Sequence, residues 1–136
     1  MNVRDDKMCF ACGENNPISL GLKFEKIGDK KVKAEFTPDK VHQGYDGIMH
    51  GGLITTLMDE AMAKVLTLNG IPALTARMSL RFKNPVPIGK ELVITAVIVK
   101  NKTGLYLTEA EVKDKKDKLY AKAQAKFMKV EKVEEE

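Results

Sequence analysis

Residues 47–70 read GIMHGGLITTLMDEAMAKVLTLNG, and this stretch decides the fold that we expect. Apolar side chains recur through it at helical spacing, at Leu53, Leu57, Ala61, Val65 and Leu68. That spacing predicts one amphipathic, largely buried helix of about 17 residues. Asn69-Gly70, followed by Pro72, predicts where the helix ends.

Segments on either side of this helix alternate between apolar and polar residues, which is typical of strands. Before the helix, residues 20–25 and 31–36 predict a hairpin that turns at Gly28-Asp29. After it, strands are expected over 74–83, 92–99, 105–112 and 119–127. The sequence therefore predicts an α+β protein in which one central helix meets five to six antiparallel strands.

Two of the expected strands carry further information. Residues 92–99 are apolar at both odd and even positions, so both faces of that strand should be covered. One helix covers one face of a sheet, and a second subunit is the simplest cover for the other, so we expect a homo-oligomer. In the strand over 74–83, alternation predicts that Leu74, Ala76 and Met78 face the core and that Thr75 points the other way.

Length and composition indicate one globular domain over residues 1–136, with an N-terminal arm over 1–17 and a frayed tail over 131–136. The chain has 43% hydrophobic and 31% charged residues and no apolar run of about 18 residues, so we expect no membrane partner. The first residues form no apolar signal segment, and there are two cysteines. Both features favour a cytoplasmic location.

The formal net charge is +4, which would attract an anionic ligand. The chain has no Trp and no block in which basic residues alternate with aromatic ones. We therefore expect no nucleic-acid partner.

Gly51-Gly52 and Asp59 are the first candidates for chemistry. The free N–H groups at a helix N-terminus can bind a carbonyl oxygen that gains negative charge, although two glycines can also merely permit a tight turn. Asp59, within the helix, is either a general base or nucleophile, or a solvated surface residue. Gly51 and Asp59 are separated by roughly 12 Å along a helix axis. A site that uses both would therefore combine two subunits.

Cys9-x-x-Cys12-Gly13 looks like half of a zinc ribbon. A structural zinc ion needs four ligands, and the chain has no second cysteine pair. We therefore expect no metal and no other cofactor, and interpret the motif as a packed turn with two thiols.

The motif His50-Gly51-Gly52-(x6)-Asp59 resembles that of the PaaI-like hotdog-fold acyl-CoA thioesterases. The resemblance extends over nearly the whole chain and includes Asn84-Pro85-Val86-Pro87-Ile88-Gly89, Cys9-Phe10-Ala11-Cys12-Gly13 and Asn16-Pro17. It implies an antiparallel sheet wrapped around one long helix, and a homodimer that often pairs into a homotetramer. It also implies hydrolysis of acyl-CoA to free acid and CoA without a metal.

The resemblance implies roles for six residues. Asp59 would attack the thioester or activate water, and the Gly51 N–H would polarise the thioester carbonyl. His50 would hold the loop or contact substrate, and Thr75 would lie near the nucleophilic water. Gly52 and Gln43 would help to bind substrate.

Two other functions remain open at this point. The first is a non-catalytic module that binds or senses acyl-CoA on the same fold. The second is a dehydratase or hydratase, against which the His-Gly-Gly spacing speaks. The sequence does not identify the acyl group.

Overall fold

The computed structural model describes residues 2–132. The long elements are α1 (Gly51–Thr67) and five strands, β3 (Lys31–Phe36), β4 (Ala73–Phe82), β5 (Leu92–Lys102), β6 (Leu105–Asp114) and β7 (Leu119–Lys129). The short elements are β1 (Asn2–Val3), β2 (Glu25–Gly28), η1 (Lys40–His42) and β8 (Glu131–Lys132).

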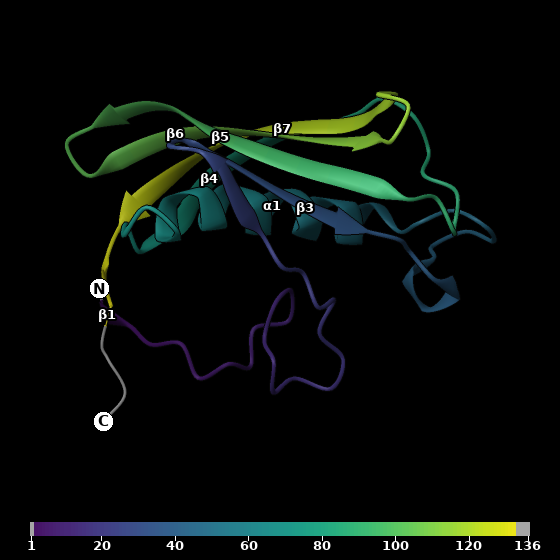
Figure 1. Cartoon of the computed structure of the whole chain (residues 1–136), viewed down its shortest axis with the longest axis horizontal. Helices are drawn as coiled ribbons and strands as arrows, with labels where there is room; N and C mark the ends of the chain where they lie inside the picture. Colours follow the sequence, from purple (N-terminus) through teal and green to yellow (C-terminus); the bar gives the residue numbers. More distant parts are fainter. Residues whose placement is uncertain (1, 133–136) are drawn as a thin grey trace.

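Six of the strands form one antiparallel sheet in the order β2-β3-β5-β6-β7-β4. Helix α1 lies along one face of this sheet (Figure 1). The core is the apolar layer between them, and its largest fully buried members include Leu57, Met58, Met62, Ile94, Val112 and Phe127. The predicted α+β architecture, with one long helix and a sheet of five to six antiparallel strands, is confirmed.

Helix α1 has 17 residues, as the apolar spacing predicts, and buries Leu57, Ala61 and Val65 on its sheet side. Its C-terminal end is closed by a hydrogen bond of 3.0 Å from the Ile71 N–H to the Leu66 carbonyl. Gly70 makes the reversal possible because its φ is +77°. Within the described residues, no helix has the length and apolar character needed to cross a membrane.

The prediction of a strand over 20–25 is wrong. The hairpin begins instead at β2, and the irregular N-terminal segment continues to Phe24 rather than stopping at residue 17. Gly21, with φ +67°, interrupts the extended backbone, and the Leu22 N–H donates to the Ala11 carbonyl at 3.0 Å. The alternation reflects burial of Leu22 within this arm, which lies on the side of α1 away from the sheet (Figure 1).

The prediction that Leu74, Ala76 and Met78 share the core face is also wrong. Thr75 pairs with Phe127 and Arg77 pairs with Lys126, so Ala76 is an extra residue that forms a β-bulge. A one-residue insertion reverses the alternation of faces. Thr75 therefore lies on the same face as Phe127, toward α1, whereas Leu74 lies on the opposite face.

Strand β5 buries one face fully, through Leu92, Ile94 and Ala96, and leaves the other face partly accessible. The expected tail over 131–136 begins with Glu131–Lys132, which form β8 and pair in parallel with β1. Residues 133–136 lie outside the described part of the chain.

Candidate active site

Asp59 and Thr75 come from different elements and meet at one hydrogen bond. Asp59 is in the middle of α1, and Thr75 is in β4 just before the bulge. The Thr75 hydroxyl donates to Oδ1 of Asp59 at 2.7 Å. This bond holds one carboxylate oxygen in place and leaves the other as an acceptor, as a base or nucleophile requires.

The N-terminus of α1 is capped by His50. Its Nδ1 accepts a hydrogen bond of 2.9 Å from the Gly52 N–H, so the ring binds the backbone of its own helix. Gly51 is the first helical residue, and its N–H has no partner within the helix. Among the described residues, no group accepts a hydrogen bond from it. Of the two glycines, Gly51 therefore offers the free donor, while the Gly52 N–H is occupied by the cap.

Gln43 lies in the loop that leads into this helix end. Its Oε1 accepts a hydrogen bond of 3.2 Å from the Gly47 N–H, and Gln43 forms a β-bridge with Met49. The His50 N–H donates to the His42 carbonyl at 2.9 Å. In this structure Gln43 therefore closes the loop that carries His50.

Strand β4 runs past α1 in the opposite direction, so that each of its ends reaches one part of the helix. Thr75, near its start, contacts Asp59. Phe82, at its end, lies beside Gly51, because a Cβ added at Gly51 would be 3.8 Å from the Phe82 ring. No local pattern in the sequence indicates that Phe82 lies at the helix N-terminus.

Gly51 and Asp59 of one chain are separated by eight residues of continuous helix. That separation is roughly 12 Å, whereas a reacting carbonyl must lie about 3 Å from both donor and base. Gly51 and Asp59 of one chain therefore cannot both contact the same carbonyl, and we call them the two candidate half-sites.

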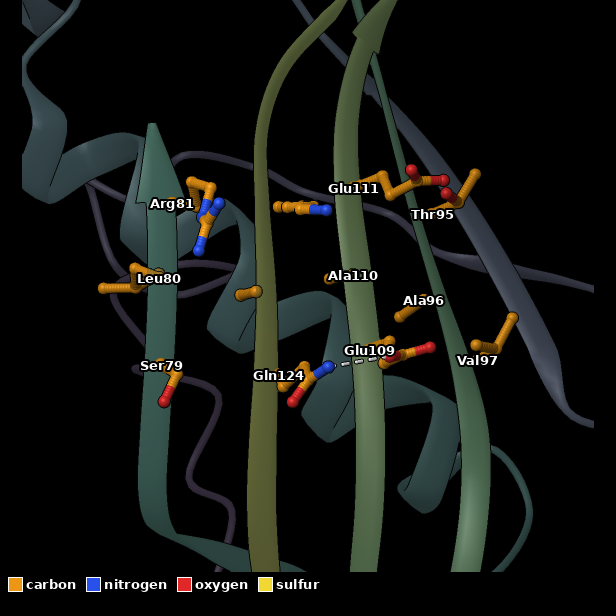
Figure 2. A pocket seen from close by; sticks show the side chains of 12 residues that line it. Ser79, Leu80, Arg81, Thr95, Ala96, Val97, Glu109, Ala110, Glu111 and Gln124 are labelled. Carbon is orange, nitrogen blue, oxygen red and sulfur yellow. Dashed lines mark hydrogen bonds between the residues drawn. The ribbon is translucent and has the colours of Figure 1, made fainter. Parts of the chain in front are cut away.

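A hollow of about 490 Å³ lies on the sheet face opposite α1 (Figure 2). Arg81, Glu109 and Gln124 line it, and the Gln124 side chain donates to Glu109 at 3.1 Å. Neither Asp59 nor Gly51 is part of it. This hollow is therefore separate from both half-sites.

Comparisons with known proteins show which family the chain resembles. The thioesterase superfamily model matches residues 46–121, which include α1 and β4. Mouse acyl-coenzyme A thioesterase 13 is 33% identical over 103 residues, which are 68% of this chain and 74% of the mouse protein. Human acyl-coenzyme A thioesterase 13 is 32% identical over 87 residues. That match covers 62% of each chain, so it spans less than two thirds of the human protein.

Solved structures share the fold. A thioesterase superfamily protein superposes with a TM-score of 0.84 at 20% identity, over 90% of this chain and 60% of its own. A hypothetical thioesterase from Streptococcus pneumoniae, solved with coenzyme A, superposes with a TM-score of 0.76 at 19% identity, over 81% and 89% of the two chains. The same protein has been solved with one aspartate and, separately, one threonine replaced by alanine, 16 positions apart.

The family model covers more than half of the described chain, and the mouse relative matches over two thirds of it. Both findings agree with the six-stranded sheet and its single long helix. The chain belongs to the thioesterase superfamily.

Proposed function

We propose that this protein hydrolyses acyl-CoA thioesters to a free acid and CoA. The hydrogen bond between Thr75 and Asp59 is the observation on which the proposal depends, because it presents an oriented carboxylate. Asp59 and Thr75 are 16 residues apart, as are the aspartate and threonine that were replaced in the streptococcal thioesterase. The curated relatives are named acyl-coenzyme A thioesterases.

In this mechanism the Gly51 N–H binds the thioester carbonyl oxygen as negative charge develops on it. Asp59 either removes a proton from the attacking water or attacks the carbonyl carbon itself. In both routes the C–S bond breaks and the CoA sulfur leaves as a thiolate that takes up a proton. The direct route forms an acyl-aspartyl anhydride, which water then opens. Single turnover in ¹⁸O-water that leaves ¹⁸O in the Asp59 carboxylate would establish the anhydride route, because label enters Asp59 only when water attacks the Asp59 carbon of the anhydride.

The two half-sites require a homodimer. Strand β4 is at one edge of the sheet, and Leu80 and Phe82 on it are 39% and 51% exposed. Pairing two β4 strands across a two-fold axis would continue the sheet and cover these side chains. Because β4 runs from Asp59 toward Gly51, that pairing would bring Asp59 of one subunit toward Gly51 of the partner subunit.

A second contact would pair the dimers into a homotetramer. The face of β5 away from α1 carries Val93 and Val97, which are only half-buried in one chain. Covering them with another subunit would remove this apolar surface from water. We place the protein in the cytoplasm on the basis of Cys9 and Cys12, which are free thiols and suit a reducing compartment.

The function is tested by measuring CoA release from phenylacetyl-, benzoyl-, hexanoyl- and palmitoyl-CoA. Chromatographic detection is preferable to a thiol reagent, because the exposed Cys9 would react with the reagent. Wild type is compared with Asp59→Asn, and with Asp29→Asn as a control for charge removal in the β2–β3 turn. We expect turnover of at least one substrate, reduced about 100-fold or more by Asp59→Asn and unchanged by Asp29→Asn.

Two outcomes would contradict this proposal. Tight binding of every acyl-CoA without turnover would instead support a binding or sensing module. Unchanged turnover in Asp59→Asn would exclude the catalytic role of Asp59.

A further inference from the structure

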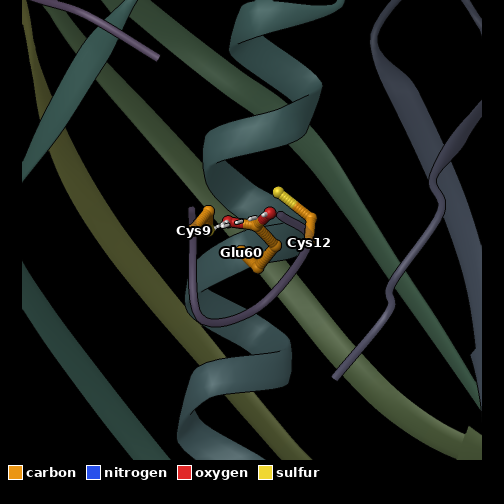
Figure 3. A group of neighbouring side chains, drawn as sticks. All are labelled: Cys9, Cys12 and Glu60. Carbon is orange, nitrogen blue, oxygen red and sulfur yellow. Dashed lines mark hydrogen bonds between the residues drawn. The ribbon is translucent and has the colours of Figure 1, made fainter. Parts of the chain in front are cut away.

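The N-terminal arm brings two cysteines to the side of α1 that the sheet does not cover. Cys9 and Cys12 lie in a turn of the arm, and Glu60 projects toward them from α1 (Figure 3). The two Sγ atoms and a Glu60 carboxylate oxygen all lie within 4.8 Å of one another. Cys9 and Glu60 are 51 residues apart in the sequence, so the fold, not a local motif, creates this cluster.

The turn that carries the cysteines is tightly fixed. The Gly13 N–H donates to the Cys9 carbonyl at 2.8 Å. A Cβ at Gly13 would lie 2.4 Å from the Cys9 nitrogen and 2.6 Å from the Lys7 carbonyl oxygen, so only glycine fits. Ala11, between the cysteines, is 4% exposed and belongs to the core. The backbone geometry of the turn therefore places both cysteines on the Glu60 side of α1.

The contacts between Cys9 and Glu60 are long. Cys9 Sγ lies 4.0 Å from each carboxylate oxygen of Glu60, at the outer limit for a sulfur hydrogen bond. A cation that binds here must displace the thiol protons, as structural metal sites do.

We propose that Cys9, Cys12 and Glu60 bind one thiophilic divalent cation, for which Zn²⁺ has the best-matched chemistry. Two thiolates and one carboxylate suit Zn²⁺, whereas Mg²⁺ and Ca²⁺ prefer oxygen ligands alone. Coordination bonds of about 2.0–2.3 Å require the three ligand atoms to close together slightly from their present separations. Water fills the fourth position, and binding releases two thiol protons without any change of oxidation state.

The sequence alone predicts no metal, because Cys9 and Cys12 are the only ligands that its spacing brings together. The third ligand is Glu60, which the sequence alone does not distinguish from a surface residue. A metal here would join the arm to α1 and would hold the arm against the helix one residue from Asp59. It would be structural, because the proposed hydrolysis uses water, Asp59 and Gly51 without a metal.

The test is Co²⁺ titration of the full chain after treatment with a chelator and a phosphine reductant. We expect one Co²⁺ per chain, with near-ultraviolet thiolate-to-Co²⁺ absorption and the intense visible bands of a tetrahedral site. Zn²⁺ should displace Co²⁺, so that both absorptions disappear, and should raise the melting temperature of the protein. Cys9→Ser and Cys12→Ser should each weaken the thiolate-to-Co²⁺ absorption, which is the charge-transfer band. Glu60→Gln should keep the band but lower the affinity about tenfold or more.

Glu14→Gln is the matched control, because Glu14 is an exposed carboxylate in the same arm. It should bind Co²⁺ as wild type does. If a cysteine variant fails to fold, reversible blocking of the wild-type thiols with a methanethiosulfonate should abolish the absorption and thiol regeneration should restore it.

The proposal is overturned if the reduced chain binds no Co²⁺ when one equivalent per chain is added. It is also overturned if the thiolate-to-Co²⁺ absorption is unchanged when both cysteines are replaced. Ready formation of a Cys9–Cys12 disulfide by a reduced chain that takes up neither Co²⁺ nor Zn²⁺ would also overturn it. That result would identify the turn as a redox pair.

Discussion

The Thr75 hydroxyl donates to Asp59 Oδ1 at 2.7 Å, although the residues are in different elements and 16 positions apart. The β-bulge at Ala76 makes this contact possible, because it places Thr75 on the α1 side of β4 together with Met78. A regular strand with Met78 facing the core would turn Thr75 away from Asp59. The bulge is therefore part of the candidate active site.

Loss of the Thr75 hydroxyl should lower kcat more than it changes KM. A hydrogen bond to a charged group contributes about 1.5–3 kcal/mol, so Thr75→Val should reduce kcat by about 10- to 150-fold. Thr75→Ser should retain most of the rate, because it keeps the donor. Thr37→Val removes an exposed hydroxyl between β3 and η1 and serves as the control. Steady-state kinetics in which Thr75→Val behaves as Thr37→Val would contradict a positioning role.

Disrupting the β4 edge should separate the proposed dimer. Leu80→Asp would place a carboxylate in an interface that a β4–β4 pair would bury, so we expect monomers and loss of turnover. Ile27→Asp is the matched control, because Ile27 is an exposed apolar residue in β2 at the other edge of the sheet. Light scattering after size-exclusion chromatography gives the mass of each variant. If only Ile27→Asp dissociated the protein, the interface would lie at the β2 edge, and the proposed β4–β4 pairing would be contradicted.

Local spacing was sufficient to predict the helix and its motif. His50, Gly51 and Asp59 belong to one helix and its cap, so their separations follow from helical geometry. The family resemblance also predicts a role for Thr75. Strand alternation, however, predicts that Thr75 points away from the core, whereas it lies on the α1 side of the sheet. Strand alternation does not reveal a bulge, because the extra residue is visible only in the pairing of Thr75 and Arg77 with β7.

Contacts between distant segments were not predictable. Leu20, Leu22 and Phe24 alternate as a strand does, but only Leu22 is fully buried and the segment pairs with no strand. The proximity of Cys9 to Glu60 depends on how the whole arm crosses α1. Such contacts depend on tertiary packing, which a single sequence does not encode in any local period.

The two glycines at the start of α1 should respond differently to alanine. A Cβ at Gly51 would make an ordinary contact of 3.8 Å with Phe82, whereas a Cβ at Gly52 would lie 3.0 Å from His50 Nδ1. Gly52→Ala should therefore displace the capping ring, and an N-cap contributes about 1 kcal/mol. We expect urea denaturation to give Gly52→Ala a lower free energy of unfolding than Gly51→Ala by about that amount.

The same comparison in a His50→Ala background is the control for this interpretation. Without the imidazole there is no cap to displace, so the difference between the two alanine variants should largely disappear. A difference that persists would mean that Gly52 acts through the backbone and not through His50.

Asp114 stabilises the turn between β6 and β7. It accepts hydrogen bonds from the Lys116 N–H at 2.9 Å, the Lys118 N–H at 3.0 Å and the Tyr120 hydroxyl at 3.1 Å. The pKa of Asp114 is lowered from its ordinary value of 3.8, chiefly by the hydrogen bond from the Lys118 N–H. The folded state therefore favours the ionised carboxylate.

The pH dependence of Asp114→Asn should reveal this contribution. A lowered pKa in the folded state stabilises the protein above pH 3.8, and the stabilisation is lost as the pH falls through the folded-state pKa. Urea denaturation should show the wild type more stable than Asp114→Asn near pH 7, with a difference that shrinks below about pH 4. Asp117→Asn, in the same turn, changes only an exposed ion pair with Lys113 and should show little difference at any pH. A constant difference for Asp114→Asn across this range would mean that the carboxylate charge contributes nothing and that only the shape of the turn matters.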